Sequence, residues 1–157
     1  ALLSELPGAR GVGVDISPAA IDVARANATA LGLDDRVGFV VADWAAGLGG
    51  RFDIIVANPP YVPTDDRETL APEIVSYEPE GAVFAGADGL DAYRETIPHL
   101  DRLLASGGAA FLEIGAGQDQ SVVELAEDQG LQVLGITKDL SGIPRCVAIA
   151  PQAQTRD

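Results

Sequence analysis

The chain has 157 residues, of which 47% are hydrophobic and 22% charged, and its formal net charge is −14. This composition is ordinary for a globular protein, and the length accommodates one domain with a real hydrophobic core. No apolar run approaches the roughly 20 residues that span a bilayer, and the acidic charge argues against nucleic acid as the main partner, because phosphate backbones repel it.

Cysteine and histidine are too sparse in this sequence for a zinc site or an internal disulfide. Cys146 is the single cysteine and His99 the single histidine, so the sequence offers no zinc-ligand set and no internal disulfide. The first residues lack the basic region and apolar run of a secretory signal. We therefore expect a cytoplasmic protein without a metal or a membrane partner.

Apolar runs alternate with helical patterns along the chain, which predicts an α/β fold with a parallel sheet flanked by helices. Strands are expected at residues 11–15, 37–42, 52–57, 109–114, 131–136 and 146–150. Helices are expected at residues 18–31, 90–105 and 118–129. The first helix has Ser17 as its cap, Pro18 at its first position and Gly32 after its end. The last two strands follow each other without a helix, so they should pair antiparallel.

Two segments lack such patterns. Residues 62–89 are rich in Pro, Gly, Asp and Glu and show little periodicity, which is typical of a functional loop or lid. Residues 151–157 are expected to be a flexible tail. The pattern contains no repeat and no internal boundary, so residues 1–150 are predicted to form one domain.

Asp15 ends the first predicted strand, directly before a helix. In nucleotide-binding α/β folds, a carboxylate at this position accepts hydrogen bonds from the ribose hydroxyls. The alternative is a turn or capping residue beside Ser17. The residues alone leave both interpretations open.

Asp43 and Trp44 follow the next strand. The carboxylate is suited to accept from the exocyclic amine of an adenine, with the indole or the local backbone lining the ring. The alternative is that Trp44, the single tryptophan, packs under a loop. Since Asp15 and Asp43 both end neighbouring strands, they should lie at the same sheet edge, which favours a shared ligand.

The run Asn58-Pro59-Pro60-Tyr61 follows the apolar strand 52–57. Two prolines lack N–H groups and fix φ at about −65°, so the chain leaves the sheet in a stiff bend. Open α/β folds place their ligands at such strand ends. The Asn58 side-chain oxygen and the Pro59 carbonyl are predicted to accept the two hydrogens of a substrate NH2 group and orient its nitrogen. Tyr61 would pack on the substrate or near a cationic methyl donor; the alternative is an ordinary Asn-Pro turn.

Three other features carry weaker signals. His99 lies within a helical pattern and is expected to be a surface or packing residue. Glu113, near a strand end, is a candidate buried structural acid. The run Gly115-Ala116-Gly117 resembles part of a phosphate loop but lacks a third glycine, so we reject that function.

Together these residues resemble class I S-adenosylmethionine-dependent methyltransferases, and more narrowly the HemK/PrmC family, the protein-glutamine methyltransferases that modify peptide chain release factors. The resemblance covers nearly the whole chain. It is carried by Gly13-Val14-Asp15-Ile16-Ser17, Ala24-Arg25-Ala26-Asn27-Ala28, Asp43-Trp44, residues 52–63, Glu73-Ile74-Val75-Ser76-Tyr77-Glu78-Pro79 and Ala87-Asp88-Gly89-Leu90-Asp91. Asn-Pro-Pro-Tyr also occurs in methyltransferases that act on amines of nucleic-acid bases. The Tyr-Glu-Pro and Asp-Gly-Leu runs and the acidic charge favour a protein substrate.

The resemblance implies a Rossmann-like sheet, mostly parallel with an antiparallel last strand. It also implies methyl transfer from S-adenosylmethionine to the amide nitrogen of a release factor glutamine, with S-adenosylhomocysteine as the product. The implied cofactor-binding residues are Asp15, Ile16, Asp43, Trp44 and Asn58. The implied substrate-binding residues are Asn58, Pro59, Pro60 and Tyr61, and of these Asn58, Pro59 and Tyr61 are the implied catalytic residues. An amide nitrogen is a weak nucleophile, so orientation by acceptors matters more than a strong base.

The chain departs from the family at its N-terminus. The family's first strand, its glycine-rich loop and a helical recognition domain would precede Ala1, and residues 1–6 correspond to the tail of the helix after that loop. The absent strand is central in the family's sheet, between the strands ending at Asp15 and Ala57. We therefore expect a partial catalytic domain with impaired cofactor binding and a tendency to associate. The alternatives are a methyltransferase acting on an amine of RNA, DNA or another protein, and a catalytically silent binding module.

Overall fold

A computed structural model describes residues 1–152 and contains two compact units. Unit 1 is Ala1–Leu48, and unit 2 begins at Gly49. Glycines flank this boundary: Gly47 has a φ of 77° and Gly50 a φ of 88°, values that glycine adopts without strain. The amino-acid pattern predicts no boundary here, and the single domain over residues 1–150 remains a prediction. Within the described residues, no helix is long and apolar enough to cross a membrane.

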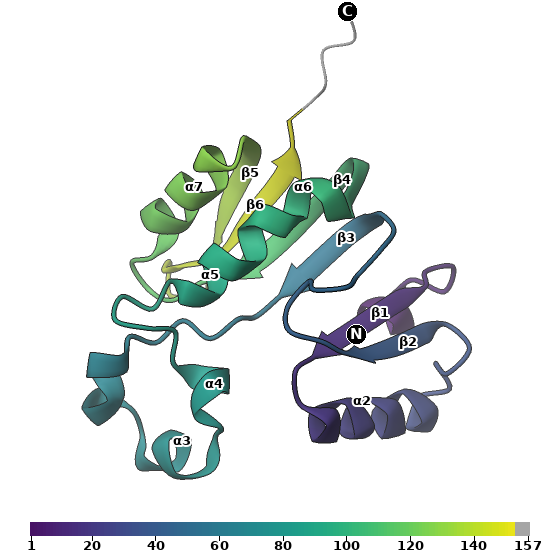
Figure 1. Cartoon of the computed structure of the whole chain (residues 1–157), viewed down its shortest axis with the longest axis horizontal. Helices are drawn as coiled ribbons and strands as arrows, with labels where there is room; N and C mark the ends of the chain where they lie inside the picture. The colour runs from purple at the N-terminus through teal and green to yellow at the C-terminus, as the bar shows by residue number, and fades with distance from the viewer. Residues whose placement is uncertain (153–157) are drawn as a thin grey trace, which may run out of the picture. The chain divides into compact units, whose positions relative to one another are not determined.

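Unit 1 is a two-stranded parallel sheet with a helix packed along it (Figure 1). Its elements are α1 (Leu2–Glu5), β1 (Gly11–Asp15), α2 (Pro18–Ala30) and β2 (Val37–Val41). Gly11 pairs with Val37 and Asp15 pairs with Val41. The two strands therefore end side by side, and the chain segments that follow them start from the same edge.

Helix α2 begins and ends as the sequence predicts. The Ser17 hydroxyl oxygen accepts from the Ala20 N–H at 3.3 Å, Pro18 is the first helical residue, and Gly32 follows the end with a φ of 66°. The helix buries Ile21 and Ala28 and packs against both strands. This packing holds the end of β1 at Asp15 directly in front of a helix N-terminus.

Unit 2 contains a four-stranded sheet in the order β3-β4-β6-β5 (Figure 1). Its elements are β3 (Phe52–Ala57), the 3-10 helix η1 (Thr64–Thr69), α3 (Pro72–Tyr77), α4 (Glu80–Val83), α5 (Asp91–Thr96), the 3-10 helix η2 (Ile97–His99), α6 (Leu100–Leu103), β4 (Leu104–Glu113), α7 (Asp119–Asp128), β5 (Leu131–Lys138) and β6 (Pro144–Pro151). Strands β3 and β4 are parallel, and β6 is antiparallel to β4 and β5. The predicted antiparallel pairing of the last two strands is confirmed. Of the predicted tail, residues 153–157 lie outside the described residues.

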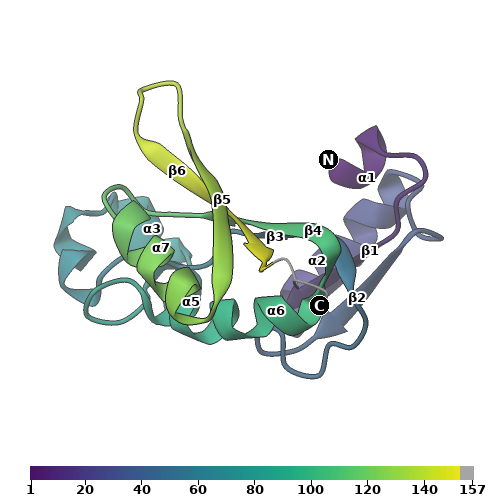
Figure 2. The same cartoon turned by 90° about the horizontal axis from the view of Figure 1, so that it is seen from above.

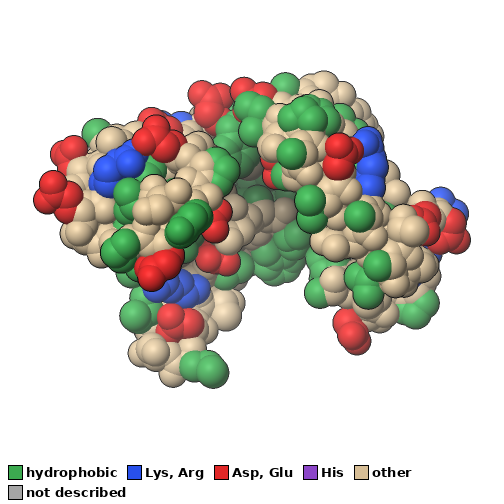
Figure 3. Space-filling model, turned by 90° about the horizontal axis from the view of Figure 1, so that it is seen from below, with side chains coloured by type: hydrophobic (Ala, Val, Ile, Leu, Met, Phe, Trp, Pro, Cys, Tyr) green, Lys and Arg blue, Asp and Glu red, His purple; other side chains and the backbone are tan. Residues whose placement is uncertain are grey.

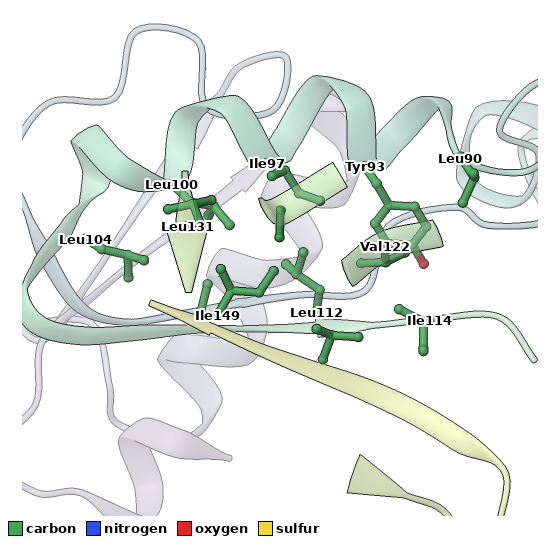
Figure 4. Packing of buried hydrophobic residues seen from close by; sticks show 13 residues of the cluster. Leu90, Tyr93, Ile97, Leu100, Leu104, Leu112, Ile114, Val122, Leu131 and Ile149 are labelled. Carbon is green, nitrogen blue, oxygen red and sulfur yellow. The ribbon is translucent and has the colours of Figure 1, made fainter. Parts of the chain in front are cut away.

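The core of unit 2 lies between one face of its sheet and the helices α5, α6 and α7, which Figure 2 shows on the same side of the strands. Leu112 and Ile149 from the sheet and Tyr93 and Ile97 from the helical side are almost completely buried (Figure 4). The Tyr93 hydroxyl donates to the backbone carbonyl of Glu113 at 2.8 Å, and burial raises the pKa of that hydroxyl. The core thereby fixes the carboxyl end of β4.

The other face of this sheet is open within unit 2. Ile54, Val56 and Phe111 are 46%, 57% and 39% exposed, whereas their strand neighbours Ile55 and Leu112 pack in the core. Among the described strands, β3 pairs only with β4, and in unit 1 β1 pairs only with β2. Each of these two strands therefore has one edge without a ladder partner in the described part of the chain.

The observed start of β4 differs from the one predicted from the sequence. The strand begins at Leu104 instead of residue 109, so the preceding helix ends at Leu103 instead of residue 105. The Arg51 guanidinium donates to the Leu104 carbonyl at 2.7 Å, and a Cβ on Gly108 would lie only 2.8 Å from the Phe52 carbonyl oxygen. The glycines of this run therefore let β4 pass close to β3 through an irregular register instead of ending a helix.

Residues 62–89, which we call the excursion, are more ordered than their composition predicts. They contain η1, α3 and α4, which have six, six and four residues. Pro72 is the first residue of α3, and Pro63 and Pro79 directly precede η1 and α4. The fixed φ of proline suits the first turn of a helix. Helices this short cover barely one or two turns, so no hydrophobic period is visible in the sequence.

Candidate functional site

Asp15 lies exposed at the carboxyl end of β1. Its Oδ1 accepts from the Ser17 N–H at 2.8 Å, so the turn role considered for this residue is confirmed. Its Oδ2 forms no hydrogen bond with the described residues. A carboxylate that is held by one oxygen and open at the other is well placed to accept from a ligand hydroxyl, and the cofactor-binding role stays a prediction.

Asp43 and Trp44 follow β2 beside Asp15. The Ala42 N–H donates to the Asp15 carbonyl at 3.1 Å, which joins the two strand ends. The expectation that both acids lie at one sheet edge is therefore confirmed. Trp44 is half-buried with a φ of 46°, in the left-handed region that costs a residue other than glycine about 1–2 kcal/mol. Such strain is concentrated at functional sites.

Ile16 supplies an apolar surface next to these acids. Its side chain is 67% exposed, which is unusual for an isoleucine directly after a strand. The Asp43 carboxylate is also exposed and has no hydrogen-bond partner in the described part of the chain. At the carboxyl ends of its two strands, unit 1 thus presents two carboxylates that can accept hydrogen bonds and one exposed apolar side chain. This set suits a nucleoside, which has hydroxyl groups and an amine.

The run Asn58-Pro59-Pro60-Tyr61 leaves β3 where its pairing with β4 ends, at Ala57 opposite Leu112. Pro59 is buried, Pro60 is half-buried and the Asn58 side chain is exposed. The prolines therefore anchor the bend in unit 2 while the asparagine amide remains accessible to a ligand. This position at a strand's carboxyl end agrees with the expectation from the sequence, and the catalytic and substrate-binding roles remain predictions.

Tyr61 is held at both its phenol and its main chain. Its hydroxyl donates to Glu113 Oε1 at 3.4 Å, and its ring packs against the core. Its carbonyl accepts from Gln118 Nε2 at 3.0 Å. Glu113 has the structural role considered for it, although its side chain is half-buried instead of buried. The end of the loop is therefore fixed, and Asn58 projects from a rigid support.

Gln118 was not singled out by the sequence patterns. Besides Tyr61, its Nε2 donates to the Gly89 carbonyl at 3.2 Å, and its Oε1 accepts from the Gly115 N–H at 3.0 Å. The Gly115-Ala116-Gly117 run, rejected as a phosphate loop, turns its first N–H to this glutamine. No local signal marks it in the sequence, because the Tyr61 and Gly89 carbonyls that its amide reaches lie 57 and 29 residues away.

The excursion folds back on itself near its two ends. The Val62 N–H donates to the Val83 carbonyl at 3.1 Å, and the Ala85 N–H donates to the Val62 carbonyl at 3.0 Å. The Arg67 guanidinium lies 4.6 Å from the centroid of the Phe84 ring, a cation–π contact. The excursion is therefore a closed lobe that leaves and re-enters the sheet region at neighbouring points.

Asp88 orders the end of this lobe. Its Oδ1 accepts from the Leu90 N–H at 3.1 Å, and its Oδ2 accepts from the Arg94 guanidinium at 2.6 Å. The hydrogen bond from Arg94 is the main reason why the pKa of Asp88 falls to about 2. The carboxylate is thus charged throughout the neutral range, and it keeps the turn at Gly89 in place.

Acidic residues outnumber basic ones in this chain, 24 to 10. Figure 3 shows acidic side chains spread over the face in view, with arginine and lysine side chains in small separate groups. In this view, the described residues of neither unit present a continuous basic stripe of the kind that binds phosphate backbones. A hollow of unit 2 lined by Leu131, Val133 and Gln152 lies at the amino end of β5, the opposite sheet end from Asn58, so we do not assign it to the site.

Comparisons with known proteins identify the family. Residues 1–99 match a family described as methyltransferase domain. The chain is 49% identical over 147 residues to the release factor glutamine methyltransferase of Rhodospirillum rubrum, covering 94% of this chain and 45% of that protein. It is 46% identical over 149 residues to the enzyme of the same name from Bradyrhizobium diazoefficiens, covering 94% of this chain and 50% of that protein. The chain thus spans about half the length of these curated relatives.

A solved structure shows the same fold. A methyltransferase from Pyrococcus furiosus superposes with a TM-score of 0.67 at 14% identity, covering 95% of this chain and 66% of that chain. At an identity this low, the superposition shows the fold alone. The superposition confirms the predicted Rossmann-like α/β fold with a mixed sheet. The resemblance to release factor glutamine methyltransferases is confirmed by the curated relatives. Since the family match covers well over half of its residues, the chain belongs to the methyltransferase-domain family.

Proposed function

We propose that this protein transfers a methyl group from S-adenosylmethionine to the side-chain amide nitrogen of a glutamine in a peptide chain release factor. One observation carries the proposal: the Asn58-Pro59-Pro60-Tyr61 run is anchored through buried Pro59 and half-buried Tyr61 while Asn58 is exposed. The names of relatives at 49% and 46% identity support the substrate. We infer a cytoplasmic location, because release factors act on ribosomes there.

The residues of unit 1 fit the proposed cofactor by their donor and acceptor chemistry. S-adenosylmethionine supplies, when bound, an electrophilic methyl group on a positively charged sulfur. The open Oδ2 of Asp15 can accept from ribose hydroxyls, and Asp43 can accept from the adenine amine. Ile16 offers an exposed apolar surface for a purine, and half-buried Trp44, which follows Asp43 in the chain, is held in a strained backbone conformation.

Asn58 and Pro59 would hold the substrate amide. A primary amide has two N–H donors, and the Asn58 side-chain oxygen and the Pro59 carbonyl provide one acceptor for each. Two acceptors at fixed positions restrict rotation of the amide and present its nitrogen in one orientation, which lowers the entropic part of the barrier. Pro60 and Tyr61 keep these acceptors in place, and the net charge of −14 disfavours a nucleic-acid substrate.

Labelled methyl transfer tests the proposed function directly. The protein as its gene encodes it is incubated with S-adenosylmethionine carrying a labelled methyl group and either a release factor from the same cell or total RNA. We expect label in the release factor, located by mass spectrometry on a glutamine amide, and none in a factor whose modified glutamine is replaced by asparagine. Label in RNA alone, or on another side chain, would contradict the proposal.

Replacing Asp15 by asparagine is expected to weaken cofactor binding. The amide keeps an oxygen for the Ser17 N–H but presents an NH2 group where the open carboxylate oxygen stood. A lost charge-assisted hydrogen bond is worth about 1.5–3 kcal/mol, so the dissociation constant should rise on the order of 10- to 100-fold. Titration calorimetry measures it. The control is Asp35→Asn, an equal charge change on the turn before β2; equal affinities of the two variants would rule out the ribose role.

A further inference from the structure

Gln118 joins three main-chain segments of unit 2 with one side chain. Its Nε2 donates to the Tyr61 carbonyl at 3.0 Å and to the Gly89 carbonyl at 3.2 Å, with a longer contact of 3.5 Å to the Asp88 carbonyl. Its Oε1 accepts from the Gly115 N–H at 3.0 Å. Both ends of the amide are therefore used, and the side chain is half-buried, which partly shields these bonds from water.

Glycines clear the space for this arrangement on two sides. A Cβ at Gly115 would lie 2.7 Å from the Gln118 Oε1, and a Cβ at Gly89 would lie 2.7 Å from the Gln118 Nε2 and 2.4 Å from the Tyr61 carbonyl oxygen. Separations this short are not tolerated by real side chains, so a larger residue at either position would displace the glutamine amide or the Tyr61 carbonyl. Glycines at two separate positions of the sequence thus make the close packing around Gln118 possible.

Two of the three joined segments, at Tyr61 and at Gly89, stand at the two ends of the excursion. Tyr61 directly precedes the excursion, and Gly89 is its last residue. Tyr61 is also the last residue of the run that presents Asn58. Because Pro59 and Pro60 have fixed φ angles, this run is stiff, and a displacement of the Tyr61 carbonyl carries over to Asn58 and to the Pro59 carbonyl.

Helix α7 does not depend on this side chain for its own stability. Gln118 makes no side-chain cap hydrogen bond, although its carbonyl accepts from the Val122 N–H at 3.0 Å as in any helix start. Val122 and Ala126 are completely buried and attach α7 to the core. The amide of Gln118 is therefore directed to the loop and the excursion instead of to its own helix.

We propose that Gln118 is a positioning residue for glutamine methylation: it fixes the Tyr61 carbonyl, and through the stiff proline run it sets the two acceptors that hold the substrate amide. The inference rests on the proposed function. Gln118 makes no contact with the substrate in this scheme, and its effect is on the orientation of Asn58 and Pro59.

The test variant is Gln118→Glu, which keeps the shape and the acceptor for the Gly115 N–H. When ionised, the introduced carboxyl places an oxygen against the carbonyls of Tyr61 and Gly89 and repels them; when protonated, it can donate to one of them. Two neighbouring carbonyl oxygens disfavour the ionised form, so the pKa of the introduced carboxyl lies above the ordinary value of about 4.3. Activity relative to wild type should therefore be lost as pH rises through that pKa and regained below it.

With release factor as substrate, kcat of Gln118→Glu at neutral pH should fall on the order of 10- to 100-fold, as expected when reacting groups are displaced by about 1 Å. The KM for S-adenosylmethionine should not change. The matched control is Gln120→Glu, the same charge change in the first turn of α7, whose exposed side chain hydrogen-bonds to Glu124 at 3.0 Å and to no other described residue. Its kcat should stay within about twofold of wild type, because surface changes of this kind have small effects.

A second readout needs no activity. The carbon-13 shift of the Tyr61 carbonyl, recorded through the Val62 amide in a triple-resonance spectrum, reports the hydrogen bond from Gln118. It should move in Gln118→Glu at neutral pH, return towards the wild-type value on acidification, and stay constant in Gln120→Glu.

The outcomes separate the two claims. Unchanged kcat in Gln118→Glu, an equal loss in both variants, or a loss without recovery at low pH would overturn the positioning role while the proposed function stands. A wild-type protein that methylates no release factor glutamine would overturn the proposed function, and the positioning role with it, even if the carbonyl shift still showed the hydrogen bond.

Discussion

Asn58→Ala is expected to lower kcat for glutamine methylation by about 100- to 1,000-fold, the range seen when one group that stabilises a transition state is removed. This corresponds to about 3–4 kcal/mol of lost transition-state stabilisation. The alanine removes one of the two acceptors proposed for the substrate amide, which then rotates freely about its remaining contact. Thermal unfolding should hardly change, because the Asn58 side chain is exposed and has no hydrogen-bond partner among the described residues.

Asn27→Ala is the matched control for this experiment. Asn27 is the only other asparagine of the sequence and lies exposed within α2. Alanine there favours the helix slightly, so stability should hold or rise while methyl transfer is unaffected. Initial rates with labelled cofactor measure both variants. A kcat for Asn58→Ala within threefold of the control would show that this asparagine does not orient the substrate.

Most elements were predictable because local signals and tertiary packing agree. At α2, the Ser17 cap, Pro18 and Gly32 mark both ends, and the structure uses all three. The apolar run Phe52–Ala57 forms a strand because its alternating residues serve two faces, one of which packs in the core. Where sequence and packing point the same way, a single sequence suffices.

The start of β4 could not be predicted for the opposite reason. Ser106, Gly107 and Gly108 carry the local signal of a helix end. Their glycines instead serve a close approach between strands: Gly108 passes the Phe52 carbonyl, and Arg51 reaches the Leu104 carbonyl. These partners are some 50 residues away in sequence, as the Arg51–Leu104 separation of 53 shows, so no local window contains the information.

The residues of the candidate site likewise divide into those that the sequence predicts and those that it does not. Asp15, Asp43 and Asn58 were found because each stands at the carboxyl end of a recognisable strand, where α/β folds bind ligands. Gln118 was not found, since its importance lies in which carbonyls its amide reaches, and those belong to segments around Tyr61 and Gly89. Supporting contacts of this kind can be identified only once the path of the folded backbone is known.

Gly89→Ala is expected to destabilise the protein by about 2–5 kcal/mol, the sum of a backbone and an overlap term, and to lower methyl transfer as well. The residue has a φ of 75°, which alanine adopts only with strain. Its new Cβ would also lie 2.4 Å from the Tyr61 carbonyl oxygen, so that carbonyl must move away. Overlaps of this kind cost about 1–3 kcal/mol beyond the backbone term. Urea unfolding measures the stability, and kcat measures the effect on the loop.

Gly142→Ala separates the two causes. Gly142 has a φ of 82°, nearly the same backbone conformation, but a Cβ there meets nothing within 4 Å. It lies in the exposed turn between β5 and β6, so alanine should cost only the backbone term of about 1–2 kcal/mol and leave kcat unchanged. The loss of unfolding free energy in Gly89→Ala beyond that in Gly142→Ala then measures the effect of the contact with Tyr61. Equal costs, with kcat intact in both variants, would mean that the Asn58–Tyr61 run tolerates movement of its carbonyl and that its rigidity does not serve the reaction.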